Sequence, residues 1–195
     1  MFSLDVNDYF DAIVRTIANM PIATIDEIVS VLLQAYDSSR MVYLFGNGGS
    51  AALASHFACD LGKGATNGFS KRFKVMALTD NVPLMTAWAN DARYEDIFAE
   101  QLVNFVQPND VAFAISCSGK SPNVVKALAV ARDAGAFTIG LTGFQGGDIK
   151  KLCDLCLVVP SDNMQIIEDL HLSIAHAVFN ALRTKICQEN GEAVA

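Results

Sequence analysis

The chain has 195 residues and a net charge of −7, and 52% of its residues are hydrophobic while 18% are charged. This composition is typical of a globular chain rather than a disordered one, and a chain of this length most simply forms one domain. A nucleic-acid surface needs a basic face, so the charge argues against such a partner. No apolar run approaches the ~20 residues of a membrane span, and the acidic start lacks the basic region of a signal peptide. We therefore expect a cytoplasmic protein that binds neither nucleic acid nor membrane.

Two N-terminal helices are predicted first. Apolar residues recur at helical spacing through residues 8–36 and are interrupted at Pro21, which places the boundary between the helices near Met20. Thr24 and Glu27 have the spacing of a capping box for the second helix. Helices this apolar must cover another surface, such as a neighbouring subunit.

Short apolar runs then alternate with helical stretches. Strands are predicted at 41–45, 74–78, 111–115, 137–141 and 155–159, and helices at 51–61, 82–89, 94–105, 124–134, 145–152 and 164–188. This alternation indicates a parallel sheet with helices on both faces. The single domain 1–195 therefore divides into N-terminal helices (1–40), an α/β core (41–160) and a C-terminal helix (161–195).

A glycine-rich loop, Gly46-Asn-Gly-Gly-Ser50, follows the first predicted strand and opens a helix. Glycines let backbone amides approach a ligand, so a strand, a loop and a helix in this order can hold an anion. The loop is not Gly-x-Gly-x-x-Gly and no P-loop lysine follows it, which argues against dinucleotides and nucleoside triphosphates.

A second loop, Ser116-Cys-Ser-Gly-Lys-Ser121, follows the strand at 111–115. Ser116, Ser118 and Ser121 supply three hydroxyls, and Ser121 before Pro122 is typical of an N-cap followed by a first-turn proline. Helix N-termini attract anions, so we interpret this turn as a phosphate cradle. Both loops leave the carboxyl ends of strands, where ligands bind in such sheets.

The three histidines, His56, His171 and His176, lie on predicted helices close to acids. His56 and Asp60 are four residues apart and share one helix face. A histidine with a nearby carboxylate can bind a metal or act as an acid/base pair, and the alternative is a surface or capping pair. Glu168 lies ~12 Å along a straight helix from His176 but only three residues from His171, so spacing alone does not choose between the two histidines.

Several separated motifs resemble the sugar isomerase (SIS) domain family. They are residues 46–50, His56 to Asp60, Asn90-Asp91, Ser116 to Ser121, Leu141-Thr-Gly143 and Glu168-Asp-Leu-His171. Within the family they look most like the phosphoheptose isomerases, which convert sedoheptulose 7-phosphate to D-glycero-D-manno-heptose 7-phosphate. The resemblance covers nearly the whole chain. It implies a doubly wound, five-stranded parallel sheet of the flavodoxin-like type and a homotetramer with active sites between subunits.

The resemblance also implies roles for individual residues. The sugar phosphate would contact Asn47, Gly48, Gly49, Ser50, Asp60, Asn90, Asp91 and Glu168, with its phosphate at Ser116, Cys117, Ser118 and Ser121. One Zn²⁺ per subunit would be held by His56, Asp60, Glu168 and His176, so the resemblance selects His176 where spacing does not.

Three positions depart from the family pattern, which usually has glutamate at Asp60, glutamine at Glu168 and threonine at Cys117. Asp60 replaces the family's proposed base with a shorter side chain, and a shift of a catalytic group by about 1 Å can cost ~100-fold in rate. We hypothesise that the carboxylate of Glu168 compensates. The alternative is that this chain acts on another sugar phosphate.

The expected reaction moves a proton between adjacent carbons through an enediol, which needs a base at carbon and an acid/base at oxygen. We assign Asp60 or Glu168 to carbon, His176 to oxygen, and zinc to orientation and polarisation of the sugar. A rival from another class is a non-catalytic SIS protein. It would be a sugar-phosphate sensor, or a tetrameric adaptor resembling the DnaA-initiator-associating relatives.

Overall fold

The computed structural model describes residues 5–66, 68–69 and 71–191. Its centre is one five-stranded parallel sheet in the order β2-β1-β3-β4-β5, the doubly wound, flavodoxin-like type that the family resemblance implies. The strands are β1 (Met41–Gly46), β2 (Lys74–Ala77), β3 (Val111–Ile115), β4 (Phe137–Thr142) and β5 (Leu155–Val158). Each agrees with its predicted range to within one residue.

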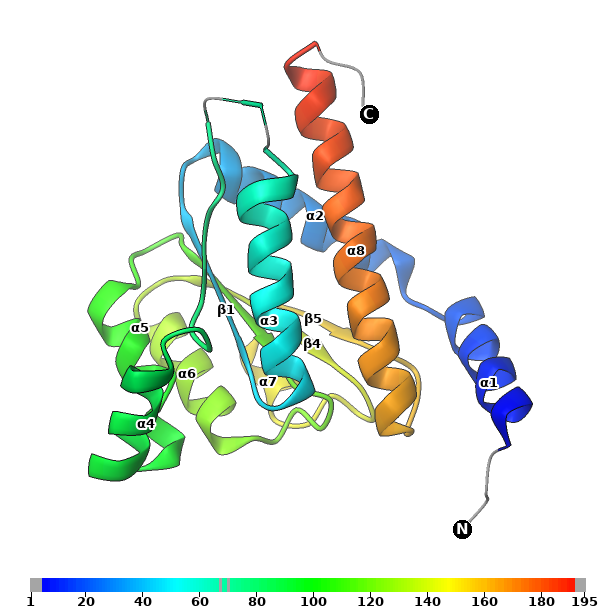
Figure 1. Cartoon of the computed structure of the whole chain (residues 1–195), viewed down its shortest axis with the longest axis horizontal. Helices are drawn as coiled ribbons and strands as arrows, with labels where there is room; N and C mark the ends of the chain where they lie inside the picture. The colour runs from blue at the N-terminus through cyan, green and yellow to red at the C-terminus, as the bar shows by residue number, and fades with distance from the viewer. Residues whose placement is uncertain (1–4, 67, 70, 192–195) are drawn as a thin grey trace.

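Helices cover both faces of the sheet (Figure 1). On one face lie α2 (Ile22–Asp37), α3 (Gly49–Cys59) and α8 (Met164–Glu189), and on the other lie α4 (Val82–Asp91), α5 (Ala99–Phe105), α6 (Pro122–Asp133) and α7 (Ile149–Leu152). Side chains of β1 alternate between the two cores: Val42 and Leu44 face the first set of helices, and Tyr43 and Phe45 face the second.

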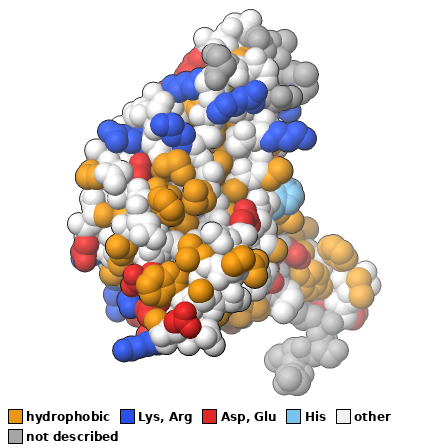
Figure 2. Space-filling view, turned by 60° about the vertical axis from the view of Figure 1, so that its left-hand side comes forward, with side chains coloured by type: hydrophobic (Ala, Val, Ile, Leu, Met, Phe, Trp, Pro, Cys, Tyr) orange, Lys and Arg blue, Asp and Glu red, His pale blue; other side chains and the backbone are white. Residues whose placement is uncertain are grey.

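The helix α1 (Val6–Ala18) lies outside these two layers, alongside α8 (Figure 1). The Tyr9 hydroxyl donates to Oδ2 of Asp169 on α8 at 2.5 Å. The outward stripe of α1 is apolar and 52–72% exposed, and it consists of Val6, Phe10, Val14 and Ile17. Figure 2 shows hydrophobic side chains on this projecting helix at the lower right.

The predicted boundary between the N-terminal helices is confirmed, but the predicted capping box is wrong. Pro21 is itself the N-cap of α2, with φ −76°, and no side chain caps this helix. Because the proline ring starts the helix at Ile22, Thr24 and Glu27 lie inside it rather than at its edge. Among the described residues no single helix is long and apolar enough to cross a membrane; α1 and α2 reach that length and composition only together, across a bend of 70°.

Three predicted helices have different bounds in the structure. The stretch 94–105 consists of a short 3₁₀ helix, η2 (Tyr94–Asp96), followed by α5. The stretch 145–152 is helical only from Ile149, because Phe144, Gly146 and Gly147 take positive φ angles that end regular structure. After α3 the chain continues as a π-helix, η1 (Asp60–Gly64), with Ala65 N donating to Asp60 O at 2.9 Å.

Candidate active site

The glycine-rich loop connects β1 to α3 at the carboxyl edge of the sheet. Gly46 has no room for a side chain, because a Cβ there would lie 2.5 Å from the carbonyl oxygen of Ile115 on β3. Gly48 is the N-cap of α3 and has φ +55°, a conformation that suits glycine. The loop therefore places Gly48 and Gly49 at the surface with the first turn of α3 behind them.

The serine loop leaves the neighbouring strand, β3, at the same edge. Ser121 is the N-cap of α6 and Pro122 its first residue, as predicted, yet the Ser121 hydroxyl makes no capping hydrogen bond. It lies instead 3.5 Å from the hydroxyl of Ser116. Gly119, with φ +63°, packs against Gly146 so closely that a Cβ would clash. The two hydroxyls thus face one space beside the N-terminus of α6, where an anion is stabilised.

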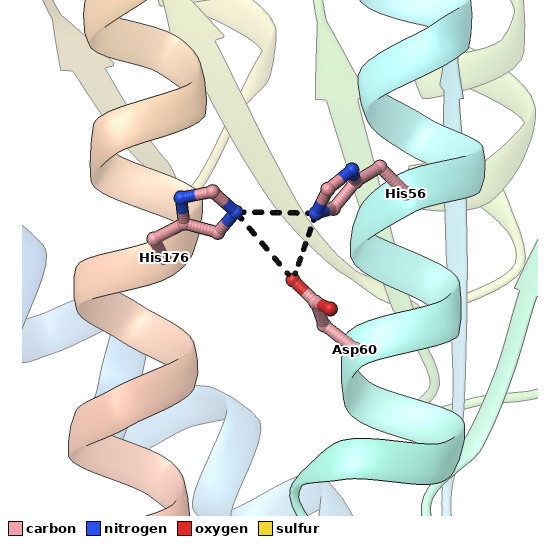
Figure 3. Close-up of side chains that lie close together, drawn as sticks. All are labelled: His56, Asp60 and His176. Atoms are coloured by element: carbon pink, nitrogen blue, oxygen red, sulfur yellow. Dashed lines mark hydrogen bonds and ion pairs between the residues drawn. The ribbon is translucent and has the colours of Figure 1, made fainter.

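Three of the four predicted metal ligands lie together between α3 and α8 (Figure 3). The Nε2 atoms of His56 and His176 are 3.1 Å apart, and Oδ2 of Asp60 lies 3.3 Å from the first and 3.9 Å from the second. Two imidazole nitrogens and a carboxylate oxygen that face one another need a proton or a cation between them.

This trio (His56, Asp60 and His176) fits Zn²⁺ in chemistry and in spacing. Neighbouring ligands of a tetrahedral zinc with bonds near 2.0 Å are about 3.3 Å apart, close to the three distances observed. Three protein ligands leave a fourth position open, as catalytic zinc sites do. The three side chains are 24–49% exposed, so the site is accessible from solvent.

Glu168, the fourth predicted ligand, lies apart from the trio at the other end of the same cleft. Its carboxylate oxygens are 3.1 Å from where a Cβ of Gly49 would be, and Oε1 is 4.0 Å from the thiol of Cys117. The carboxylate therefore lies at the first turn of α3, where the helix dipole favours a negative charge. A cleft of about 230 Å³ extends from Gly49 and Glu168 to His56, the member of the trio that lines it.

The two remaining candidates with shifted pKa values are buried and neutral. Burial, together with the nearby charge of Glu168, raises the pKa of the Cys117 thiol to about 11, so the thiol is a hydrogen-bond donor at neutral pH. Burial lowers the pKa of His171 to about 4. Nε2 of His171 lies 3.1 Å from the carbonyl oxygen of Thr142, so the neutral ring donates there. His171 thus faces β4, while His176 faces the trio.

Asn90 and Asp91 end α4 on the exposed surface, and the Asn90 amide donates to Asp91 Oδ1 at 2.8 Å. Within the described part of the chain, no hydrogen bond joins them to either loop. Two residues that the sequence did not single out bond to Asn47 of the glycine-rich loop. Tyr94 does so from the segment after α4, and the buried Asn123 does so from the first turn of α6. A polar residue in the first turn of α6 was the available signal for Asn123.

A larger cleft, of about 540 Å³, opens beside Arg40 and Arg132 near the amino ends of β3 and β4. It contains none of the predicted site residues. Size alone therefore does not identify the site; the cleft between α3 and α8 is the candidate because two loops at the carboxyl edge meet histidines and carboxylates there.

Comparisons with known proteins show the family of the chain. The SIS domain family model matches residues 7–143. A phosphoheptose isomerase of Helicobacter hepaticus is 38% identical over 167 residues, which are 86% of this chain and 84% of that one. The solved phosphoheptose isomerases of Neisseria gonorrhoeae and Francisella tularensis superpose with a TM-score of 0.85 at 28% and 29% identity, covering 92% and 94% of this chain and 97% and 100% of theirs. The chain therefore belongs to the SIS domain family and is of the phosphoheptose isomerase type.

Proposed function

We propose that this protein isomerises sedoheptulose 7-phosphate to D-glycero-D-manno-heptose 7-phosphate at the cleft between α3 and α8. The observation that carries the proposal is the meeting of His56, Asp60 and His176 beside the loops that leave β1 and β3. The names of the relatives support the same reaction. They also favour an enzyme over a non-catalytic sensor or adaptor.

The substrate phosphate is held by the serine loop. Ser116, Ser118 and Ser121 offer hydroxyls, and the N-terminus of α6 adds its partial positive charge. Cys117 offers a weaker donor than a hydroxyl, and its neutral thiol adds no negative charge that would repel a phosphate. Asn47, Gly48 and Gly49 meet the sugar from the opposite side of the cleft.

Glu168 is the better placed base for the proton at carbon. Asp60 faces two imidazoles, so its carboxylate is engaged, whereas Glu168 has only a thiol 4.0 Å away and the first turn of α3 beside it. His176 is our candidate to carry the proton between the two oxygens of the enediol, through Nδ1 when its Nε2 holds a metal in the trio. The glutamate thus takes over the role that the shorter Asp60 has lost.

The trio would hold Zn²⁺, and zinc bound there would polarise the oxygens of the sugar as a Lewis acid. His56 and Asp60 come from one continuous helical stretch, and His176 comes from α8. The trio therefore also ties the two helices that line the cleft.

We further propose a homotetramer. Four apolar residues of α1 are exposed in a row, and exposed apolar stripes of this kind mark interfaces. A second copy that covers α1 would also lie near Asp169, which lines the cleft.

The test is turnover of sedoheptulose 7-phosphate by the zinc-loaded protein and by His176→Ala. We expect a loss of at least ~100-fold in kcat for the variant, because it removes a general acid/base. Ser173→Ala, on an exposed position of the same helix, is the matched control and should keep wild-type kcat. Wild-type turnover by His176→Ala would sink the assignment. A wild-type protein that binds the sugar phosphate but never converts it would identify a sensor instead.

A further inference from the structure

The two loops at the carboxyl edge are joined by a pair of side-chain amides. Nδ2 of Asn47 donates to Oδ1 of Asn123 at 2.9 Å, and Nδ2 of Asn123 donates to Oδ1 of Asn47 at 2.8 Å. Asn47 belongs to the glycine-rich loop after β1, and Asn123 to the first turn of α6 after β3. The ring of two hydrogen bonds therefore bridges 76 residues of sequence and couples the sugar side of the site to the phosphate side.

One backbone group sets the orientation of both amides. The backbone nitrogen of Val124 lies 3.0 Å from Oδ1 at the end of the Asn123 side chain. Because an N–H can only donate, the side-chain atom that faces it must be the oxygen. The nitrogen of Asn123 then points to Asn47, whose facing atom must in turn be its oxygen. The Tyr94 hydroxyl donates to that same oxygen at 3.2 Å.

This arrangement determines what Asn47 offers to a ligand. Its oxygen already accepts two hydrogen bonds, and one of its N–H groups is used in the ring. Its second N–H has no acceptor within the described part of the chain. Asn47 can thus donate one hydrogen bond to a ligand and accept none, so it recognises an oxygen with a free lone pair.

We propose that Asn123 and Tyr94 are positioning residues that hold Asn47 as a one-way donor to an acceptor oxygen of the sugar. Asn123 is only 2% exposed and does not reach a ligand itself. Tyr94 is 59% exposed, yet its hydroxyl is tied to Asn47, so it links the segment after α4 to the glycine-rich loop. This inference rests on the proposed function insofar as the ligand is a sugar phosphate whose phosphate occupies the serine loop.

The experiment is a double-mutant cycle on binding, with calorimetric titration of sedoheptulose 7-phosphate and, separately, of inorganic phosphate. Asn123→Leu is close in size and neutral, makes no hydrogen bond to Asn47, and leaves the Val124 N–H with its bond to the Ser121 carbonyl at 3.1 Å. We expect Asn47→Ala and Asn123→Leu each to weaken binding of the sugar phosphate by about tenfold and to leave binding of inorganic phosphate unchanged. The double variant should be no weaker than Asn47→Ala, because Asn123 acts only through Asn47.

Two further variants guard against a folding defect. Tyr94→Phe removes only one hydroxyl from an exposed side chain, and we expect it to weaken binding of the sugar phosphate about threefold. Ser118→Ala should weaken binding of both sedoheptulose 7-phosphate and inorganic phosphate, since Ser118 belongs to the phosphate side of the site. Losses that multiply in the double variant, or an equal loss of inorganic phosphate binding in Asn123→Leu, would overturn the inference.

A failure of the proposed function gives a different result. If the wild-type protein binds the sugar phosphate without converting it, the isomerase proposal fails and the binding cycle still decides the role of Asn123. If it binds no sugar phosphate, hydrogen exchange of the Asn47 side-chain amide decides. One slow and one fast proton in the wild type, with both fast in Asn123→Leu, support the pairing, and two fast protons in the wild type contradict it.

Discussion

The Nε2 atoms of His56 and His176 lie 3.1 Å apart although 120 residues separate them in the chain. Two ring nitrogens at this distance either share a proton or face a common cation, and Asp60 supplies the negative charge that a cation needs. A metal bound by these three side chains would therefore hold α3 and α8 together.

The first prediction concerns zinc. Adding Zn²⁺ to chelator-treated protein should raise the Tm, because a ligand that binds only the folded state stabilises it; a concentration 100 times Kd adds about 2.7 kcal/mol. His56→Ala should abolish this rise. Glu168→Gln should leave it unchanged, since Glu168 lies outside the trio. Zinc content by atomic absorption and Tm by calorimetry check both statements, and a Glu168→Gln protein that loses its zinc would restore Glu168 as a ligand.

The second prediction separates the base from the metal. Glu168→Gln keeps the size of the side chain and removes its basicity, so we expect kcat to fall by about 10²–10⁴-fold. Asp60→Asn should lower zinc affinity as well as kcat, because its carboxylate faces both histidines. Steady-state kinetics with measured zinc content distinguishes the two. Full activity in Glu168→Gln would return the role of base to Asp60.

The third prediction is a pH dependence of stability that comes from His171. Its folded pKa of about 4 is below the usual 6.5, so between these values the unfolded chain binds a proton that the folded protein does not. The free energy of unfolding should therefore fall as the pH drops from 6.5 to 4, by about 3 kcal/mol from this group. His171→Gln can still donate to the Thr142 carbonyl but does not titrate.

Urea unfolding at pH 4.5 and pH 7 measures the effect. Carboxylates add the same pH dependence to both proteins. The quantity compared is therefore the loss of unfolding free energy between pH 7 and pH 4.5, in the wild type and in His171→Gln. The variant should lose less stability on acidification than the wild type. Equal losses would show that His171 titrates normally in the folded state.

The fourth prediction concerns the apolar stripe of α1. Phe10 is 61% exposed and Val14 66%, so replacing both with serine should change the free energy of unfolding of one subunit by little. The replacement should instead shift the protein to smaller species, because the interface loses its apolar contact area. Light scattering after gel filtration measures the mass. Asp11→Ala, on an exposed position of the same helix, should keep the wild-type mass. A wild-type monomer at micromolar concentration contradicts the proposed tetramer.

The central strands were predictable because β1, β3 and β4 are buried on both faces and are therefore nearly continuous apolar runs. In β3, all five residues are buried, and they stand out from the polar turns around them. Helices were predictable where apolar residues recur at helical spacing over a long stretch, as in α8. They were poorly predictable where the stretch is short. A run such as 145–152 contains the right residues for a helix, but the φ angles of Gly146 and Gly147 end the pattern.

The site was predictable only where its partners share one element. His56 and Asp60 lie one turn apart, so the sequence contains their pairing. The approach of His176 came from the resemblance, because no local pattern reports which residue a helix 120 positions away will present. The positions of Glu168 against Gly49 and of Asn123 against Asn47 are set by tertiary packing, and neither has a local signal.

All five strands precede α8 in the chain, and α8 supplies both Glu168 and His176. On the ribosome, the sheet and both anion-binding loops therefore emerge before the acid and the histidine that would act on a substrate. The same helix buries a row of apolar residues in the core, so a chain that stops before α8 lacks part of its core as well as both side chains. Loss of α8 would therefore remove stability and the two candidate catalytic groups together.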